Sequence, residues 1–135
     1  MSPNGIIASG VTARVTKFRQ AAFVYLHVAI LYEAAAYAMW QRGLLPSTRL
    51  AGPAWPWLII GAVVALAVFF GLYRWQNVWL ARIVWALHGL RLPALIDGAF
   101  FSGSEPRLGP PSFYLTAIVV VMINLWMLAR AGWDL

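Results

Sequence analysis

The stretch from Trp55 to Tyr73, WPWLIIGAVVALAVFFGLY, decides the fold class because it carries no charged side chain. A hydrocarbon core of about 30 Å needs about 20 apolar residues in a helix, and this stretch provides nearly that length. The whole chain of 135 residues has the same character, with 62% hydrophobic and 10% charged residues. Soluble domains average about 45–50% apolar and about 25% charged residues. The sequence therefore predicts an integral membrane protein.

Three further stretches have the length and composition of membrane-spanning helices. The four predicted transmembrane helices cover residues 18–40, 55–73, 77–100 and 112–129. The two longer segments between them are rich in proline and glycine, as loops are, while the link YRWQN at 73–77 predicts a tight hairpin. Residues 1–16 are expected to form a loose or interfacial leader. The expected fold is all-α, a bundle of four transmembrane helices that forms one domain over residues 1–135.

Basic residues near the ends of the predicted helices indicate an orientation. One side of the membrane carries five of them, Arg14, Lys17, Arg19, Arg74 and Arg130, and the other side carries three, Arg42, Arg49 and Arg107. Because basic loops stay on the cytoplasmic side, both termini are predicted to be cytoplasmic. The expected location of the chain is the inner membrane of a prokaryote. The basic residues form no cluster typical of nucleic-acid binding. The expected partners are the lipid bilayer and other membrane subunits or a second copy, with no nucleic acid.

Polar side chains inside a bilayer are costly, so each of them suggests a function or a specific partner. Asn124 is the polar residue of the fourth predicted helix. Glu33 and Arg91, in the first and third, lie about 18 Å and about 20 Å from the cytoplasmic face by helical rise. Their matched depth predicts an intramembrane ion pair that fixes the register of the two helices. Two alternatives stay open, a proton or substrate site and an Arg91 side chain that reaches towards the outer surface.

Two histidines, His27 and His88, together with Asn77, are candidate contacts for a cofactor or a partner. Two imidazoles from different helices of a bundle can hold a b-type haem. Asn77, His88 and Arg91 fall within about 60° of one another and form one polar stripe on the third helix. His27 lies about 120° away from Glu33, so it is expected to face another helix or another subunit. The first expectation is no cofactor and no metal, with haem b or a quinone as the alternative.

Gly89 and Pro93 mark an expected break in the third helix. Proline has no N–H group to donate, so the carbonyl of Gly89 loses its helical partner. The helix is predicted to kink or end at Pro93, and such breaks are tolerated at depth where protein or water covers them. His88 lies directly before this break without an evident partner in the chain. It is therefore the residue at which a cofactor or a second subunit is most expected.

The chain lacks the HExxH, nucleophile-elbow and phosphate-loop motifs of common enzymes, and it has no cysteine. We therefore expect no catalytic residues. Small residues of the first helix, such as Ala34 and Ala38, suit close helix packing. The expected function is a small non-catalytic accessory or assembly subunit of a larger membrane complex, with a respiratory complex as the expected setting. The alternatives are an electron-transfer subunit that binds b-haem or quinone through His27 and His88, and a proton-coupled carrier with Glu33 as the coupling residue.

Overall fold

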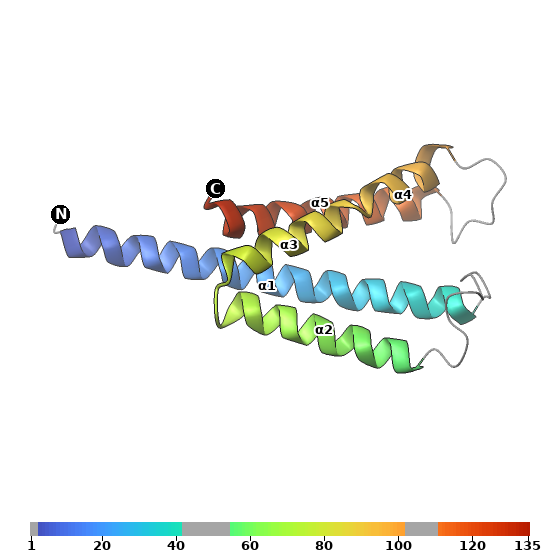
Figure 1. Ribbon diagram of the computed structural model, residues 1–135. Coiled ribbons are helices and arrows are strands. Elements are labelled where there is room, and N and C mark those ends of the chain that lie inside the picture. Colours follow the sequence, from blue (N-terminus) through green and yellow to red (C-terminus); the bar gives the residue numbers. More distant parts are fainter. Residues whose placement is uncertain (1–2, 42–54, 102–110) are drawn as a thin grey trace.

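The computed structural model describes residues 3–41, 55–101 and 111–135, and within these ranges the chain is helical apart from short turns (Figure 1). In chain order the elements are α1 (Pro3–Gln41), α2 (Trp55–Tyr73), α3 (Val78–Gly89), α4 (Leu92–Ile96), the π-helix η1 (Asp97–Phe101) and α5 (Pro111–Trp133). No strand occurs in the described ranges. The all-helical class predicted from the sequence is confirmed.

Three segments are long and apolar enough to cross a membrane, namely Pro56–Tyr73, Val78–Phe101 and Pro111–Trp133. They coincide closely with the second, third and fourth predicted helices. The second of these segments joins α3, α4 and η1 into one interrupted rod that continues in one direction (Figure 1). The agreement in both position and length supports the assignment of the chain to the membrane proteins.

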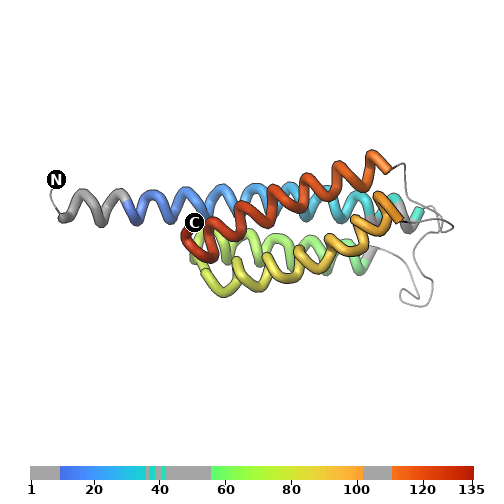
Figure 2. The backbone as a smooth tube through the Cα atoms, turned by 90° about the horizontal axis from the view of Figure 1, so that it is seen from above, coloured from blue at the N-terminus to red at the C-terminus, as the bar shows by residue number. Residues whose placement is uncertain are grey.

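α1 is the element around which the others are arranged. It packs against α2 and against α5, and α3 packs against α5. The N-terminal part of α1 extends beyond the other helices (Figure 1), and in the view from above the coloured part of α1 also does so (Figure 2). The core is built from residues of α1, α2, α3 and α5, and its fully buried large side chains include Phe18, Leu72 and Leu128.

Small residues bring the helices close together at this core. Ala21 of α1 and Ala81 of α3 are fully buried. Gly132 of α5 lies so close to α3 that a Cβ atom there would stand 3.2 Å from Cγ of Arg82. Close approach through alanine and glycine is typical of helices that associate in membranes, where van der Waals contact replaces the hydrophobic effect as the main attraction.

The link between α2 and α3 is the tight hairpin that the sequence predicts. The N–H of Asn77 donates to the carbonyl of Gly71 at 3.2 Å, which closes the turn. Gln76 adopts a positive φ of 47°, a conformation that lets the chain reverse within a few residues. The side chain of Asn77 then caps α3 by accepting a hydrogen bond from the N–H of Leu80 at 3.1 Å.

The third membrane segment is interrupted where Gly89 and Pro93 predict a break. α3 ends at Gly89. The N–H of Arg91 donates to the carbonyl of His88 at 3.1 Å, so this bond spans three residues where an α-helical bond spans four. α4 then starts at Leu92, with Pro93 in its first turn, where a missing N–H costs nothing. The π-helical turn that follows was not predicted. It brings Gly98 against the ring of Tyr114 in α5, where a side chain larger than hydrogen would collide.

Residues 3–16 differ from the predicted loose leader, because they form the first turns of α1. Pro3 stands at the first helical position, where its fixed φ favours helix initiation. Residues 10–14 and 16 are exposed, so the small polar composition that suggested a leader is also compatible with an exposed helix there. Whether this part lies in the membrane interface stays a prediction.

Candidate functional site

Three buried side chains from three helices meet near the centre of the structure. Tyr25 of α1, His88 of α3 and Asn124 of α5 have exposed fractions of 6%, 6% and 0%, and we call them the His88 cluster. The side-chain amide of Asn124 is hydrogen-bonded to Nδ1 of His88. The ring of Tyr25 stacks on the imidazole, with 5.4 Å between centroids and 26° between planes. The cluster therefore ties α1, α3 and α5 together through polar and aromatic contacts.

The polar atoms of the His88 cluster do not all find partners. With the amide nitrogen of Asn124 donating to Nδ1 of His88, the proton of the neutral imidazole is assigned to Nε2. Oδ1 of Asn124 is buried and has no hydrogen-bond partner among the described residues. A buried acceptor without a partner costs about 1–3 kcal/mol. The cluster thus offers one free acceptor to any donor that reaches it.

The predicted ion pair of Glu33 and Arg91 is not formed, since no salt bridge joins them among the described residues. The guanidinium of Arg91 lies over the ring of Tyr32, with Cζ 3.8 Å from the ring centroid. The carboxylate of Glu33 lies against Gly61 of α2, where a Cβ atom would collide with Oε1. The predicted depth of Arg91 is correct to within one residue of α1, because Arg91 contacts Tyr32, the neighbour of Glu33. The predicted partner differs because neighbouring side chains of a helix point about 100° apart, and Glu33 faces α2.

His27 is exposed on the outer face of α1. Its Nδ1 lies 2.7 Å from the carbonyl oxygen of Phe23, one turn earlier in the same helix. Tyr25, which stacks on His88, is two residues away and therefore about 200° around the helix. His27 consequently points away from His88, and the structure does not bring the two predicted haem ligands together in one chain.

The remaining predicted site residues have structural roles. Asn77 belongs to the start of α3, where it caps the helix. Gly89 and Pro93 border the interruption between α3 and α4. No group of three histidine, aspartate or glutamate side chains that could hold a metal ion occurs in the described part of the chain. The polar stripe predicted on the third helix therefore divides into a cap, the His88 cluster and the Arg91–Tyr32 contact.

The cluster contains two residues that the sequence analysis did not assign to it. Asn124 was visible as the polar residue of the fourth predicted helix, but its partner depends on how α5 rotates against α3. Tyr25 carried no signal, because a tyrosine in a hydrophobic helix is equally compatible with lipid contact. The partners of His88 thus lie within the chain, where the sequence suggested none.

Basic side chains gather around the C-terminal end of α5, close to residues 14–20 of α1 and to the start of α3. Nζ of Lys17 lies 2.8 Å from Oδ1 of Asp134. Arg82 donates from Nε to the carbonyl of Gly132 at 3.0 Å, and its guanidinium lies over the rings of Trp79 and Trp133 at 5.2 and 5.3 Å. These contacts join the end of α5 to α1 and α3.

The Lys17–Asp134 pair makes a pH-dependent prediction. The hydrogen bond and the charge of Lys17 hold the pKa of Asp134 below its ordinary value. A lowered pKa in the folded state stabilises the fold above the ordinary aspartate pKa, and this contribution is lost as the pH falls through the lowered value. An NMR titration of the Asp134 carboxyl should show this pKa, and Lys17→Gln should return it to the ordinary range. An unchanged pKa in Lys17→Gln would contradict the pair; Arg19→Gln is the control. Because the side chain of Asp134 is 82% exposed, we expect little effect on overall stability.

Comparisons with protein-family models, with curated proteins and with solved structures found no significant match to this chain. The arguments about function therefore rest on the contacts described above.

Proposed function

We propose that the chain is a small non-catalytic accessory or assembly subunit of a larger membrane complex. The observation that carries this proposal is the exposure of His27 in the middle of α1. Lipid tails offer no hydrogen-bond partner, so an imidazole that faces them is costly. Its bond to the carbonyl of Phe23 uses one ring nitrogen only. A polar group on the helix of another polypeptide would satisfy the other nitrogen.

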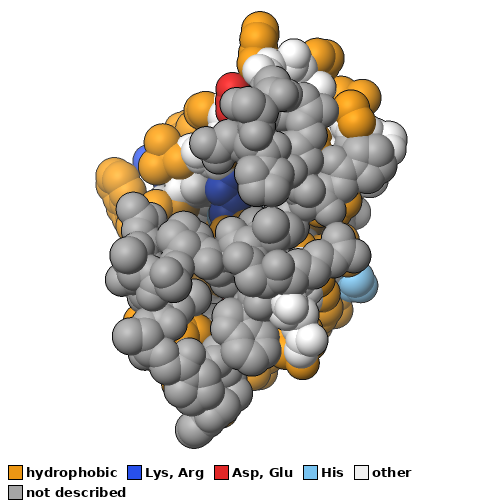
Figure 3. Space-filling view, turned by 90° about the vertical axis from the view of Figure 1, so that its right-hand side faces the viewer, with side chains coloured by type: hydrophobic (Ala, Val, Ile, Leu, Met, Phe, Trp, Pro, Cys, Tyr) orange, Lys and Arg blue, Asp and Glu red, His pale blue; other side chains and the backbone are white. Residues whose placement is uncertain are grey.

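The surface around His27 supports contact with another helix. Leu31, Ala34 and Ala38 lie within about 40° of His27 on α1, and all four residues are exposed. Small residues spaced by four positions let two helix backbones approach closely. Figure 3, which looks along the helices, shows hydrophobic side chains around the rim of the described atoms, with a histidine among them. We call the strip of α1 formed by His27, Leu31, Ala34 and Ala38 the His27 face.

The proposal includes α1 as a fourth transmembrane helix, with both termini in the cytoplasm of a prokaryotic cell. α1 runs alongside α2 and α5, which are both apolar enough to cross a membrane. A helix that packs along two membrane-spanning helices shares their environment. The excess of basic residues at the end that carries Arg14, Lys17 and Arg130 favours the cytoplasmic side for that end. A respiratory complex stays the proposed setting, to be identified by its other subunits.

The two alternative functions have less support. A b-haem or quinone site at His88 would need a second ligand or donor from a partner chain, because His27 points away from His88. The cofactor would also have to reach an imidazole that is only 6% exposed and that Tyr25 covers on one face. A proton-coupled carrier would need a water-accessible path to Glu33, whose carboxylate lies against the backbone of Gly61. An absorption spectrum of the purified assembly decides the haem alternative. Transport that is lost in Glu33→Gln would support the carrier.

A photocrosslinking experiment tests the accessory function. A photoreactive amino acid at position 27 in native membranes should join the chain to a different polypeptide. Position 64 of α2 is the matched control. The contact of Phe23 with Phe69, 5.5 Å between centroids, sets α2 at the corresponding depth, and Val64 is 52% exposed. We expect no protein crosslink at position 64.

Three results would contradict the proposal. Crosslinking at position 27 to lipid alone would show that the His27 face has no protein partner. A product that contains two copies of this chain and nothing else would replace the larger complex by a homodimer. Equal crosslinking to another polypeptide from positions 27 and 64 would show that the His27 face is not a specific contact.

A further inference from the structure

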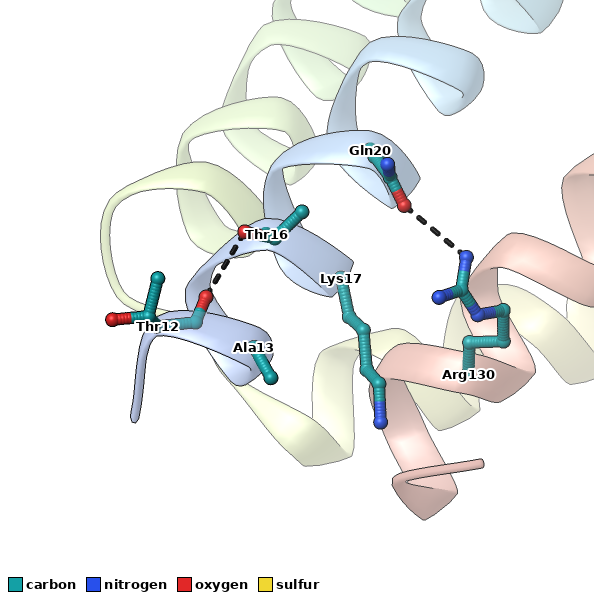
Figure 4. A pocket seen from close by; sticks show the side chains of 6 residues that line it. All are labelled: Thr12, Ala13, Thr16, Lys17, Gln20 and Arg130. Atoms are coloured by element: carbon teal, nitrogen blue, oxygen red, sulfur yellow. Dashed lines mark hydrogen bonds between the residues drawn. The ribbon is translucent and has the colours of Figure 1, made fainter. Parts of the chain in front are cut away.

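We propose that the end of the structure near Lys17 and Arg130 binds the phosphate of an anionic phospholipid headgroup. An open hollow of about 570 Å³ lies there between α1 and α5. Its lining residues are Thr12, Ala13, Thr16, Lys17, Gln20 and Arg130 (Figure 4). In this view the Lys17 side chain extends from α1 towards the end of α5, and the guanidinium of Arg130 turns towards Gln20 of α1. The proposal does not depend on the accessory function.

The charges of this region are unbalanced. A second hollow of about 280 Å³ adjoins the same helix ends and is lined by Arg14, Arg82 and Asp134 among others. Together the linings of the two hollows carry four cationic side chains and one carboxylate, that of Asp134. Asp134 is paired with Lys17. A ligand that carries negative charge would therefore offset the excess positive charge at this end of the structure.

Arg130 is the cation best placed for such a ligand. Its guanidinium donates to Oε1 of Gln20 at 3.2 Å and lies 3.9 Å from Sδ of Met127, and both of these partners are neutral. The fork of an arginine presents several N–H donors, so most of them stay available after one bond to an amide oxygen. A phosphate group accepts such donors in pairs.

The position of the hollow favours a lipid over a soluble anion. Arg130 stands in the last turn of α5, at the end of a segment that is apolar enough to cross a membrane. Trp126 and Ile123 point within about 40° of Arg130 along the same helix, and they are 57% and 48% exposed. An anionic headgroup at Arg130 would therefore continue into acyl chains along an apolar surface. Basic pockets at the cytoplasmic ends of membrane helices suit anionic headgroups in this way.

Native mass spectrometry of the full chain released from detergent micelles tests this site. Phosphatidylglycerol and phosphatidylcholine with identical acyl chains are added at equal concentrations. We expect preferential retention of phosphatidylglycerol by the unmodified protein. Arg130→Gln should weaken this binding about fivefold, as expected for one basic residue at a membrane surface. Arg130→Lys, which keeps the charge, should retain most of the preference.

Arg19→Gln is the matched control. It removes one positive charge from the same end of the structure, but Arg19 does not line the hollow and lies over the ring of Tyr73, 5.3 Å from its centroid. Equal retention of the two lipids by the unmodified protein would overturn the proposal without any variant. An equal loss in Arg19→Gln and Arg130→Gln would overturn it in favour of diffuse charge attraction. Displacement of the lipid by millimolar inorganic phosphate would instead identify a site for a free anion.

Discussion

Replacing Leu128 by alanine is expected to lower the free energy of unfolding by about 2–3 kcal/mol. Leu128 is fully buried in the core, in the same cluster as Phe18 of α1 and Leu72 of α2. Leucine-to-alanine changes in well-packed cores cost about 2–5 kcal/mol. In a membrane the unfolded helices remain in lipid, so the lost van der Waals contact is the larger part and the lower half of this range applies.

Leu115→Ala is the control for this prediction, because it makes the same change in the same helix. Leu115 is 44% exposed and lies outside the core, so we expect a change below about 0.5 kcal/mol. Unfolding of both variants would be followed in bicelles by a denaturant titration. Equal destabilisation by the two variants would mean that α5 does not pack against α1 through Leu128.

Replacing His88 by leucine is expected to destabilise the fold by about 1–2 kcal/mol, because Asn124 then loses its hydrogen-bond partner in the bundle. Oδ1 of Asn124 already lacks a partner, so the whole amide would stay unpaired. Hydrogen bonds between membrane helices are worth about 1–2 kcal/mol in model peptides and about 0.6 kcal/mol on average in double-mutant cycles. The cost exceeds the average bond because a buried polar group is left behind.

A double-mutant cycle distinguishes this hydrogen bond from general packing. In His88→Leu/Asn124→Leu both polar groups are removed, so the double variant should be more stable than the sum of the single losses predicts. Tyr25→Phe keeps the ring that stacks on His88 and serves as the control, with a change close to zero. Strict additivity of His88→Leu and Asn124→Leu in the same unfolding assay would contradict the contact between α3 and α5 at this point.

The helical elements were largely predictable because their signals are local. The apolar run from Trp55 to Tyr73 and the break before Pro93 follow from composition and from the missing proline N–H. The depth of Arg91 was also predictable, since helical rise alone brings it beside Tyr32. These properties depend on distance along one helix, and the sequence records that distance directly.

The contacts between helices were not predictable in the same way. They depend on how each helix rotates about its axis, and in a membrane nearly every face is apolar, so composition does not mark the face that turns inward. Glu33 therefore contacts Gly61 where an ion pair with Arg91 was expected. For the same reason Asn124, a residue visible in the sequence, could not be assigned to His88.

The mass of the assembly extracted gently from native membranes tests the proposed accessory function most directly. The chain alone has a mass of 15.0 kDa. We predict a larger particle that contains this chain together with other membrane polypeptides, and that loses the chain when the His27 face is changed by His27→Leu. An assembly that contains only this chain, as a monomer or as copies of itself, would contradict the proposed function.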